Sequence, residues 1–188
     1  LLNKWIKLKN GKLFALVFDH RIRNNSKEES RIVKDLLVSK NIETLIIKPN
    51  KNNLIKKNMA NARFNRFEGI IKFCIKKNIF HLFLGHHFDD NLETYLIRKI
   101  NGSNLDGLSS MSKITYFNKI QIIRPLIDVK KTSILNFNKK NNIKYILDPS
   151  NNDINYTRVK VRNFLKNAKY NTLVKKDFIN LNKQIPDY

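Results

Sequence analysis

Residues 86–93 carry two imidazoles and three carboxylates in the order His-His-Phe-Asp-Asp-Asn-Leu-Glu. Asp90 and Glu93 are three positions apart, so on the first turn of a helix they share one face and could hold an ammonium group or Mg²⁺. Alternatively, Asp89 and Asp90 cap the helix and favour its positive dipole end, which accounts for one carboxylate more easily than for three. Two histidines could also bind a transition metal, but the i, i+4 pair of a zinc protease is missing. We therefore predict a functional site in this segment.

Two groups of cations could bind phosphate. Arg63 and Arg66 are three positions apart within a predicted helix, where two guanidinium groups could clamp a phosphate, although a solvated helix face would look the same. Arg158, Lys160 and Arg162 follow a polar turn and could contact phosphate or an RNA backbone. By charge alone, this second group would be an ordinary basic start of a helix.

Short apolar runs alternate with segments of helical spacing along the chain, and these elements must position the polar groups. The patterns predict strands at 12–18, 42–47, 79–84, 120–124 and 143–147, and helices at 1–9, 26–41, 58–77, 91–100 and 130–141. The first helix has no capped start, so we expect the chain to begin inside an element, whereas Ser26 and Glu29 form a capping box.

The alternation of strands and helices predicts a doubly wound α/β fold, a parallel sheet with helices on both faces. We expect the strands near 13–18, 42–47 and 79–85 to be neighbours in this sheet. Ligands bind at the carboxyl ends of such strands. Two predicted ends carry dense polar groups, at 19–21 and at 86–90. The site should therefore lie at this edge.

Composition limits the class of protein. The chain has 188 residues, of which 41% are hydrophobic and 28% charged, so we expect a soluble protein with one core. Its net charge of +22 would attract a polyanion such as RNA or an acidic membrane surface, unless the excess only reflects lysines and asparagines scattered over a solvated surface. Cys74 is the single cysteine, which excludes an internal disulfide and a Cys-ligated zinc site. Without an apolar stretch of membrane-spanning length or a signal peptide, we expect a cytoplasmic protein.

Six motifs occur in an order that resembles the N-type ATP pyrophosphatase domain of the tRNA(Ile)-lysidine synthetase family. They are Phe18-Asp19-His20-Arg21-Ile22-Arg23, Ala62-Arg63-Phe64-Asn65-Arg66-Phe67, the segment 86–94, Gly102-Ser103-Asn104-Leu105-Asp106-Gly107-Leu108, Arg124-Pro125-Leu126 and Asp148-Pro149-Ser150-Asn151. The likeness is collinear over roughly residues 12–165. It implies an adenine nucleotide alpha hydrolase-like fold.

The resemblance implies a ligase that uses ATP and Mg²⁺ to attach L-lysine to the wobble cytidine of the CAU anticodon of isoleucine tRNA, through an adenylated tRNA. By motif position, it assigns catalysis to Arg66, Asp90, Glu93 and Arg162, ATP binding to Asp19, His20, Arg63 and His86, and tRNA binding to Arg124, Arg158 and Lys160. Asp90 and Glu93 would hold the lysine, while the arginines would contact phosphate or substrate. The resemblance allows a homodimer and implies no membrane.

Departures from the family pattern bear on individual contacts. The family usually has Arg at position 101, Asn at 159 and Arg at 160, where this chain has Asn101, Val159 and Lys160. We expect the family's Ser-Gly-Gly-x-Asp-Ser phosphate loop to precede residue 1, so residues 1–165 would be the adenylating domain without its first strand and residues 166–188 the start of a carboxyl-terminal region. This chain alone should then be inactive. Alternatives are a tRNA 2-thiolation enzyme, which would need more cysteines, and a non-catalytic RNA-binding module, which would not need the acidic cluster.

Overall fold

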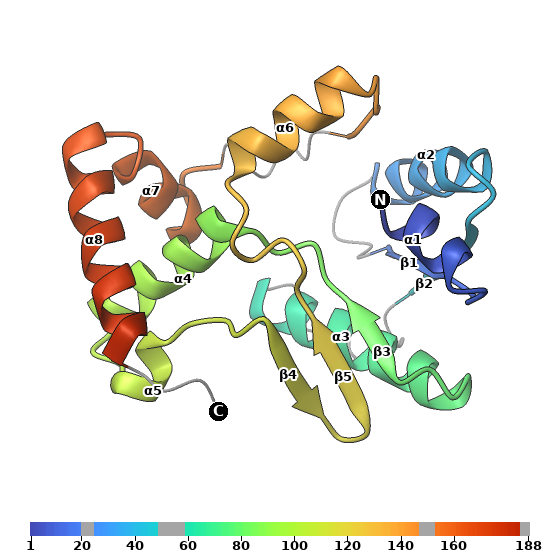
Figure 1. Cartoon of the computed structure of the whole chain (residues 1–188), viewed down its shortest axis with the longest axis horizontal. Coiled ribbons are helices and arrows are strands. Elements are labelled where there is room, and N and C mark those ends of the chain that lie inside the picture. Colours follow the sequence, from blue (N-terminus) through green and yellow to red (C-terminus); the bar gives the residue numbers. More distant parts are fainter. Residues whose placement is uncertain (20–24, 49–58, 147–152, 185–188) are drawn as a thin grey trace. The chain divides into compact units, whose positions relative to one another are not determined.

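The computed structural model shows the expected alternation of strands and helices (Figure 1). It describes residues 1–19, 25–48, 59–146 and 153–184, and only the backbone of 59–63. The chain forms two units, Leu1–Phe80 (unit 1) and His81–Tyr188 (unit 2). His20, the Arg63 side chain and the Asp148–Asn151 turn of the predicted motifs lie outside the described residues. No helix in the described ranges is long and apolar enough to cross a membrane.

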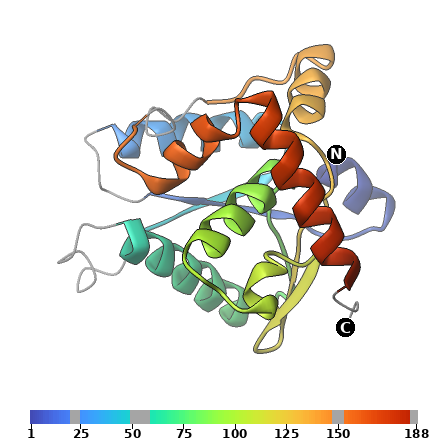
Figure 2. The ribbon, with the colours of Figure 1, turned by 90° about the vertical axis from the view of Figure 1, so that its left-hand side faces the viewer.

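Unit 1 is built on two parallel strands. Its elements are α1 (Leu2–Leu8), β1 (Phe14–Phe18), α2 (Ser26–Val38), β2 (Glu43–Ile47) and α3 (Met59–Lys76). Phe14 lies opposite Glu43 in the ladder. α3 packs closely on the strands at Gly69, where an added Cβ would lie 3.2 Å from the Phe18 ring. α2 covers the other face (Figure 2), so these two strands have helices on both sides.

Unit 2 contains a second sheet of three strands, β3 (His81–Phe83), β4 (Ile114–Phe117) and β5 (Ile120–Ile123). β5 pairs in parallel with β3 and antiparallel with β4, which follows it in the order β3-β5-β4. The α/β class with parallel strands and helices is confirmed.

Three details of the sheet prediction are wrong. The described strands form two sheets, β1-β2 and β3-β5-β4, so the ladder partner of β3 is β5. β4 was missed although its run Ile114–Phe117 consists of β-branched and aromatic residues; three of its four residues are exposed, and it forms a hairpin with β5. The run 143–146 is not a strand, because an apolar run becomes one only when a ladder partner is available, and none pairs with it among the described residues.

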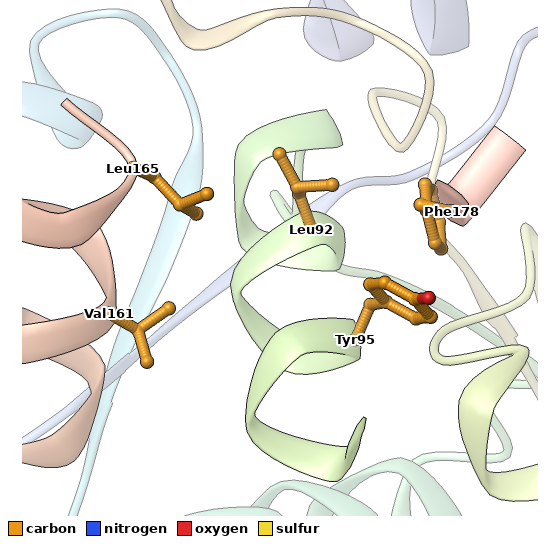
Figure 3. Packing of buried hydrophobic residues seen from close by; sticks show 5 residues of the cluster. All are labelled: Leu92, Tyr95, Val161, Leu165 and Phe178. Atoms are coloured by element: carbon orange, nitrogen blue, oxygen red, sulfur yellow. The ribbon is translucent and has the colours of Figure 1, made fainter. Parts of the chain in front are cut away.

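The helices of unit 2 are α4 (Phe88–Ile100), α5 (Leu105–Leu108), α6 (Lys131–Lys140), α7 (Thr157–Phe164) and α8 (Ala168–Gln184). α4 lies between α7 and α8, and buried side chains on both sides of α4 form one apolar cluster with residues from these neighbours (Figure 3). Leu92 and Tyr95 of α4 meet Val161 and Leu165 on one side and Phe178 of α8 on the other. Burial of each such side chain contributes roughly 1.5–3 kcal/mol, so this cluster fixes α4.

Candidate active site at the start of helix α4

The first turn of α4 is fixed by a capping box. His87 is the N-cap, with an extended backbone at φ −126° and ψ 175°. The Asp90 N–H donates to His87 Nδ1 at 3.3 Å, and the His87 N–H donates to Asp90 Oδ2 at 3.2 Å. The helix therefore begins at Phe88, three residues before the predicted start. Asp90 takes part in capping this helix, which was the alternative interpretation of its carboxylate from the sequence.

Asp89 connects this turn to the start of α6. Its Oδ2 accepts a hydrogen bond from the Lys131 N–H at 2.7 Å. The Phe88 N–H donates to the carbonyl of Val129, two residues before Lys131, at 3.0 Å. These two bonds anchor the backbone next to Asp90 to residues 129–131. The position of the Asp90 carboxylate therefore depends on this segment as well as on the capping box.

Glu93 is buried with 3% of its surface exposed, and it forms an ion pair with α7. Arg162 donates to both carboxylate oxygens, from Nε at 2.8 Å and from an Nη at 3.2 Å. This bidentate bond is the main reason that the pKa of Arg162 is raised above its ordinary value. A buried carboxylate without such a partner would be strongly destabilising, so α7 makes Glu93 tolerable.

Arg158 completes the contact between α4 and α7. An Nη of Arg158 donates to Thr94 Oγ1 at 2.9 Å, and its Nε lies 3.9 Å from Glu93 Oε2. The Thr94 hydroxyl in turn donates to the Asp90 carbonyl at 2.8 Å. Arg158 and Arg162 are four residues apart and share a helix face, so both guanidinium groups reach the same flank of α4.

The result is a polar cluster with two carboxylates and two guanidinium groups, built on α4 and α7. A model of the PP-loop domain matches residues 1–169. The chain belongs to the PP-loop domain family.

Curated relatives of this PP-loop domain are called tRNA(Ile)-lysidine synthase. The chain is 33% identical over 166 residues to the protein of Orientia tsutsugamushi, covering 88% of this chain and 37% of that protein. Over 171 residues it is 34% identical to that of Wolbachia pipientis wMel (88% and 39%), and over 179 residues 33% identical to that of Rickettsia bellii (95% and 41%). The chain thus spans about two fifths of the length of these relatives.

A solved structure with a similar fold is the U34-tRNA thiolase NcsA from Methanococcus maripaludis with its [4Fe-4S] cluster. The TM-score is 0.77 at 18% sequence identity, covering 98% of this chain and 66% of that chain. This likeness confirms the fold of the PP-loop domain.

The predicted catalytic residues divide between the two units. Asp90, Glu93 and Arg162 meet in unit 2, as described above. Arg66 belongs to α3 in unit 1, where burial lowers the pKa of its guanidinium. That Arg66 shares a cleft with Asp90 stays a prediction. The Arg162 to Glu93 ion pair was not anticipated, because its partners are 69 positions apart in the sequence.

The residues predicted to bind ATP also lie in both units. Asp19 follows β1, is 2% exposed and accepts a hydrogen bond from the Ser26 hydroxyl at 2.9 Å. This bond replaces the predicted capping box, since the N-cap of α2 is Asn25 and the Ser26 side chain turns to the strand end instead. His86 lies half-buried between β3 and α4. The nucleotide roles of Asp19 and His86 stay predictions.

The three residues predicted to bind tRNA have different environments. Arg158 holds Thr94 as described, while Lys160 is exposed on α7. Arg124 donates to the Ser112 carbonyl at 2.9 Å and to Thr115 Oγ1 at 3.0 Å, and burial lowers its pKa. The contacts of Arg124 connect β5 to the chain around β4, which favours a structural function.

A second polar cluster, on the other flank of α4, was not predicted. The Tyr95 hydroxyl donates to Asp177 Oδ2 at 2.6 Å, and the Lys99 ammonium group contacts the same oxygen. Burial, followed by this hydrogen bond, raises the pKa of Tyr95, and the Lys99 bond lowers the pKa of Asp177. Tyr95 and Asp177 are distant in the sequence, so no local pattern predicted their contact.

The described residues give little support to a protein-built magnesium site. Among them, no group of three or more His, Cys, Asp or Glu side chains could hold a metal ion. Glu93 is neutralised by Arg162, and Asp90 Oδ2 accepts the His87 N–H, so the pair is not an open carboxylate site. Asp90 and Glu93 therefore do not fit the joint Mg²⁺ site considered from the sequence.

Proposed function

We propose that the protein ligates L-lysine to the wobble cytidine of the CAU anticodon of isoleucine tRNA, using ATP. The observation that carries this proposal is the identity of 33–34% to lysidine synthases over 88% or more of this chain. Membership of the PP-loop domain family supports ATP as the cosubstrate. The arrangement of α4 and α7 supplies the acids and cations that this reaction needs.

The reaction would proceed in two steps on the cytosine. The C2 oxygen attacks the α-phosphorus of ATP, a P–O bond forms, and pyrophosphate leaves. The lysine ε-amine then attacks C2, the C–O bond to AMP breaks, and the nitrogen loses a proton. A carboxylate near the amine can orient it and accept that proton. We assign this function to Asp90, whose side chain is 19% exposed at the start of α4.

Glu93 has a different part in this proposal. Its side chain is 4% exposed and its carboxylate forms a bidentate bond with Arg162, so it is less accessible to an incoming amine than Asp90. We assign Glu93 to hold Arg162, whose side chain is 27% exposed and can face a phosphate. Arg158 supports the same flank through Thr94. The sequence-based interpretation assigned Asp90 and Glu93 together to hold the lysine, whereas this proposal assigns the lysine to Asp90 and gives Glu93 the function of holding Arg162.

The remaining assignments extend the proposal to ATP. By motif position, the nucleotide would be bordered by Asp19, His20, Arg63 and His86. Its phosphates would be contacted by Arg66. Mg²⁺ would accompany ATP through phosphate oxygens, which suits an ion that usually keeps few protein ligands. The boundary after residue 165 that the sequence predicts would separate α8 from α4, on which Phe178 packs, so we propose that the adenylating domain includes α8 and that the carboxyl-terminal region follows it. We also propose that the enzyme is cytoplasmic and forms a homodimer.

A tRNA thiolase is the second candidate, because the solved structure with a similar fold has that activity. Thiolase NcsA carries a [4Fe-4S] cluster, and such clusters are held by Cys thiolates. This chain has only Cys74, which is 1% exposed and whose pKa is raised by burial. Cys74 is therefore a buried thiol rather than a ligand or sulfur carrier, and the ligase is favoured.

The test is an assay of the full-length protein with radiolabelled lysine, ATP and an isoleucine tRNA transcript with the CAU anticodon. We expect lysine to enter the tRNA with release of AMP and pyrophosphate, and only when ATP is present. A transcript with uridine at the wobble position is the matched control and should take up no lysine. Binding of the tRNA without lysine incorporation would contradict the ligase and favour an RNA-binding module, whereas sulfur incorporation would favour the thiolase.

A further inference from the structure

Two aromatic rings stack on the surface where α7 passes into α8. Phe164 and Tyr170 have ring centroids 4.6 Å apart and an interplanar angle of 11°, and they are 45% and 43% exposed. The turn between them is well bonded, with the Asn171 side chain donating to the Leu165 carbonyl at 2.8 Å and the Lys169 N–H to Asn167 Oδ1 at 3.0 Å. The pair is thus a fixed apolar surface that the core of unit 2 does not use.

The charged residues around this pair are all basic. Residues 154–176 contain seven Lys and Arg and no Asp or Glu. Arg158 and Arg162 turn inward to α4, whereas Lys160, Lys166 and Lys169 are exposed. These three lysines form no ion pair within the described ranges, so their charge is available to an outside anion.

We infer that Phe164 and Tyr170 form a stacking platform for an unpaired RNA base, with Lys160, Lys166 and Lys169 binding the flanking phosphates. An aromatic face accepts any base, and adjacent cations neutralise the backbone on both sides of it. A protein partner with an apolar surface would not match this density of uncompensated positive charge. That the RNA is the isoleucine tRNA rests on the proposed function, while the platform itself rests on the α7–α8 geometry.

The test uses the full 188-residue chain and a single-stranded RNA of about 12 nucleotides with one central 2-aminopurine, whose fluorescence falls when it stacks. The variant Phe164→Leu/Tyr170→Leu keeps apolar bulk and removes the rings. We expect it to abolish the quenching and to weaken binding about tenfold. The matched control Tyr116→Leu/Phe117→Leu changes two exposed aromatics of β4 and should bind as the wild type does.

A second variant tests the cations and remains informative if the ring variant fails to fold. Lys166→Gln/Lys169→Gln should retain quenching at saturating RNA but reduce the slope of log K against log salt by about 1.4. Quenching and affinity that are unchanged in the ring variant would overturn the platform. So would equal losses in the β4 control, a salt slope that is unchanged in the lysine variant, or stronger binding to phosphatidylserine vesicles that depends on the same rings.

The outcomes separate the platform from the ligase. If the ring variant loses RNA quenching while the full-length wild type incorporates no lysine, the platform stands and the proposed function fails. If the wild type incorporates lysine but the ring variant binds RNA normally, the function stands and the platform fails. Circular dichroism melting of each variant provides the check on folding.

Discussion

Helix α4 has a polar cluster on each flank, and the two differ in their access to water. Towards α7, the Glu93 side chain is 4% exposed and is held by Arg162 through two hydrogen bonds. Towards α8, the Asp177 side chain is 49% exposed and accepts hydrogen bonds from Tyr95 and Lys99. Both clusters join a carboxylate to a cation across two helices, but only the first excludes most solvent.

The difference separates a buried contact at the candidate site from an exposed contact that attaches a helix. A buried ion pair contributes little net stability compared with apolar residues, yet removing one partner is costly. An exposed pair contributes between nothing and about 1 kcal/mol and is weakened by salt. The α7 flank is therefore hard to explain by stability alone, which supports its place in the candidate site.

The largest effect should follow Glu93→Ala. This change leaves Arg162 and Arg158 without their carboxylate at a largely buried position, so we expect the free energy of unfolding to fall by about 3 kcal/mol. Urea unfolding followed by circular dichroism measures this loss. A loss of unfolding free energy below about 1 kcal/mol would show that the Glu93 ion pair behaves like the exposed pair of Asp177 and Lys99.

Tyr95→Phe should have an intermediate effect. The ring stays in the apolar cluster beside Phe178, but the hydrogen bond of its hydroxyl to Asp177 is lost. We expect a loss of about 1 kcal/mol, the usual net contribution of such a bond. The same urea experiment measures it, and a loss as large as that of Glu93→Ala would remove the contrast between the flanks.

Asp177→Asn should have a small effect of at most about 1 kcal/mol at low salt. Since the ion pair with Lys99 is half exposed, added salt should bring the unfolding free energies of variant and wild type closer together. A difference that stays constant up to molar salt would indicate that this pair is shielded from solvent after all.

Acid titration should give the smallest signal. The bond from Lys99, followed by that from Tyr95, lowers the pKa of Asp177 in the folded state. Its stabilising contribution is therefore complete above the unfolded value of 3.8 and is lost as pH falls through the lower folded value. Below about pH 4, the wild type should lose more stability than Asp177→Asn, measured by urea midpoints at each pH. Parallel curves would refute the direction of the pKa shift.

Local patterns were sufficient for most elements and for the location of the acidic cluster. Apolar runs and helical spacing predicted β1, β2, β5, α3 and α6 to within about two residues, because each depends on its own sequence. The segment 86–93 indicated the candidate site, since five titratable side chains rarely gather at one strand end without use.

Long-range pairing could not be predicted in the same way. Glu93 and Arg162 are 69 positions apart, and Tyr95 and Asp177 are 82 apart, so no periodicity within either segment reveals the partner. The absence of a strand at 143–146 in the described part of the chain has a similar cause, because a strand requires a ladder partner that only the tertiary structure supplies. The strand β4 could have been predicted, since its Ile-Thr-Tyr-Phe run pairs with β5 across a local hairpin. Local sequence also gave no reason for His87 to be an N-cap.

The central claim is that the start of α4, and Asp90 in particular, handles the lysine. It is tested most directly by comparing lysine transfer to isoleucine tRNA by full-length Asp90→Asn and Asp177→Asn proteins, two variants that remove one carboxylate charge in unit 2. We expect Asp90→Asn to reduce transfer by about 100-fold or more with tRNA binding nearly unchanged, and Asp177→Asn to retain most activity. Full transfer by Asp90→Asn, or an equal loss in both variants, would contradict the account.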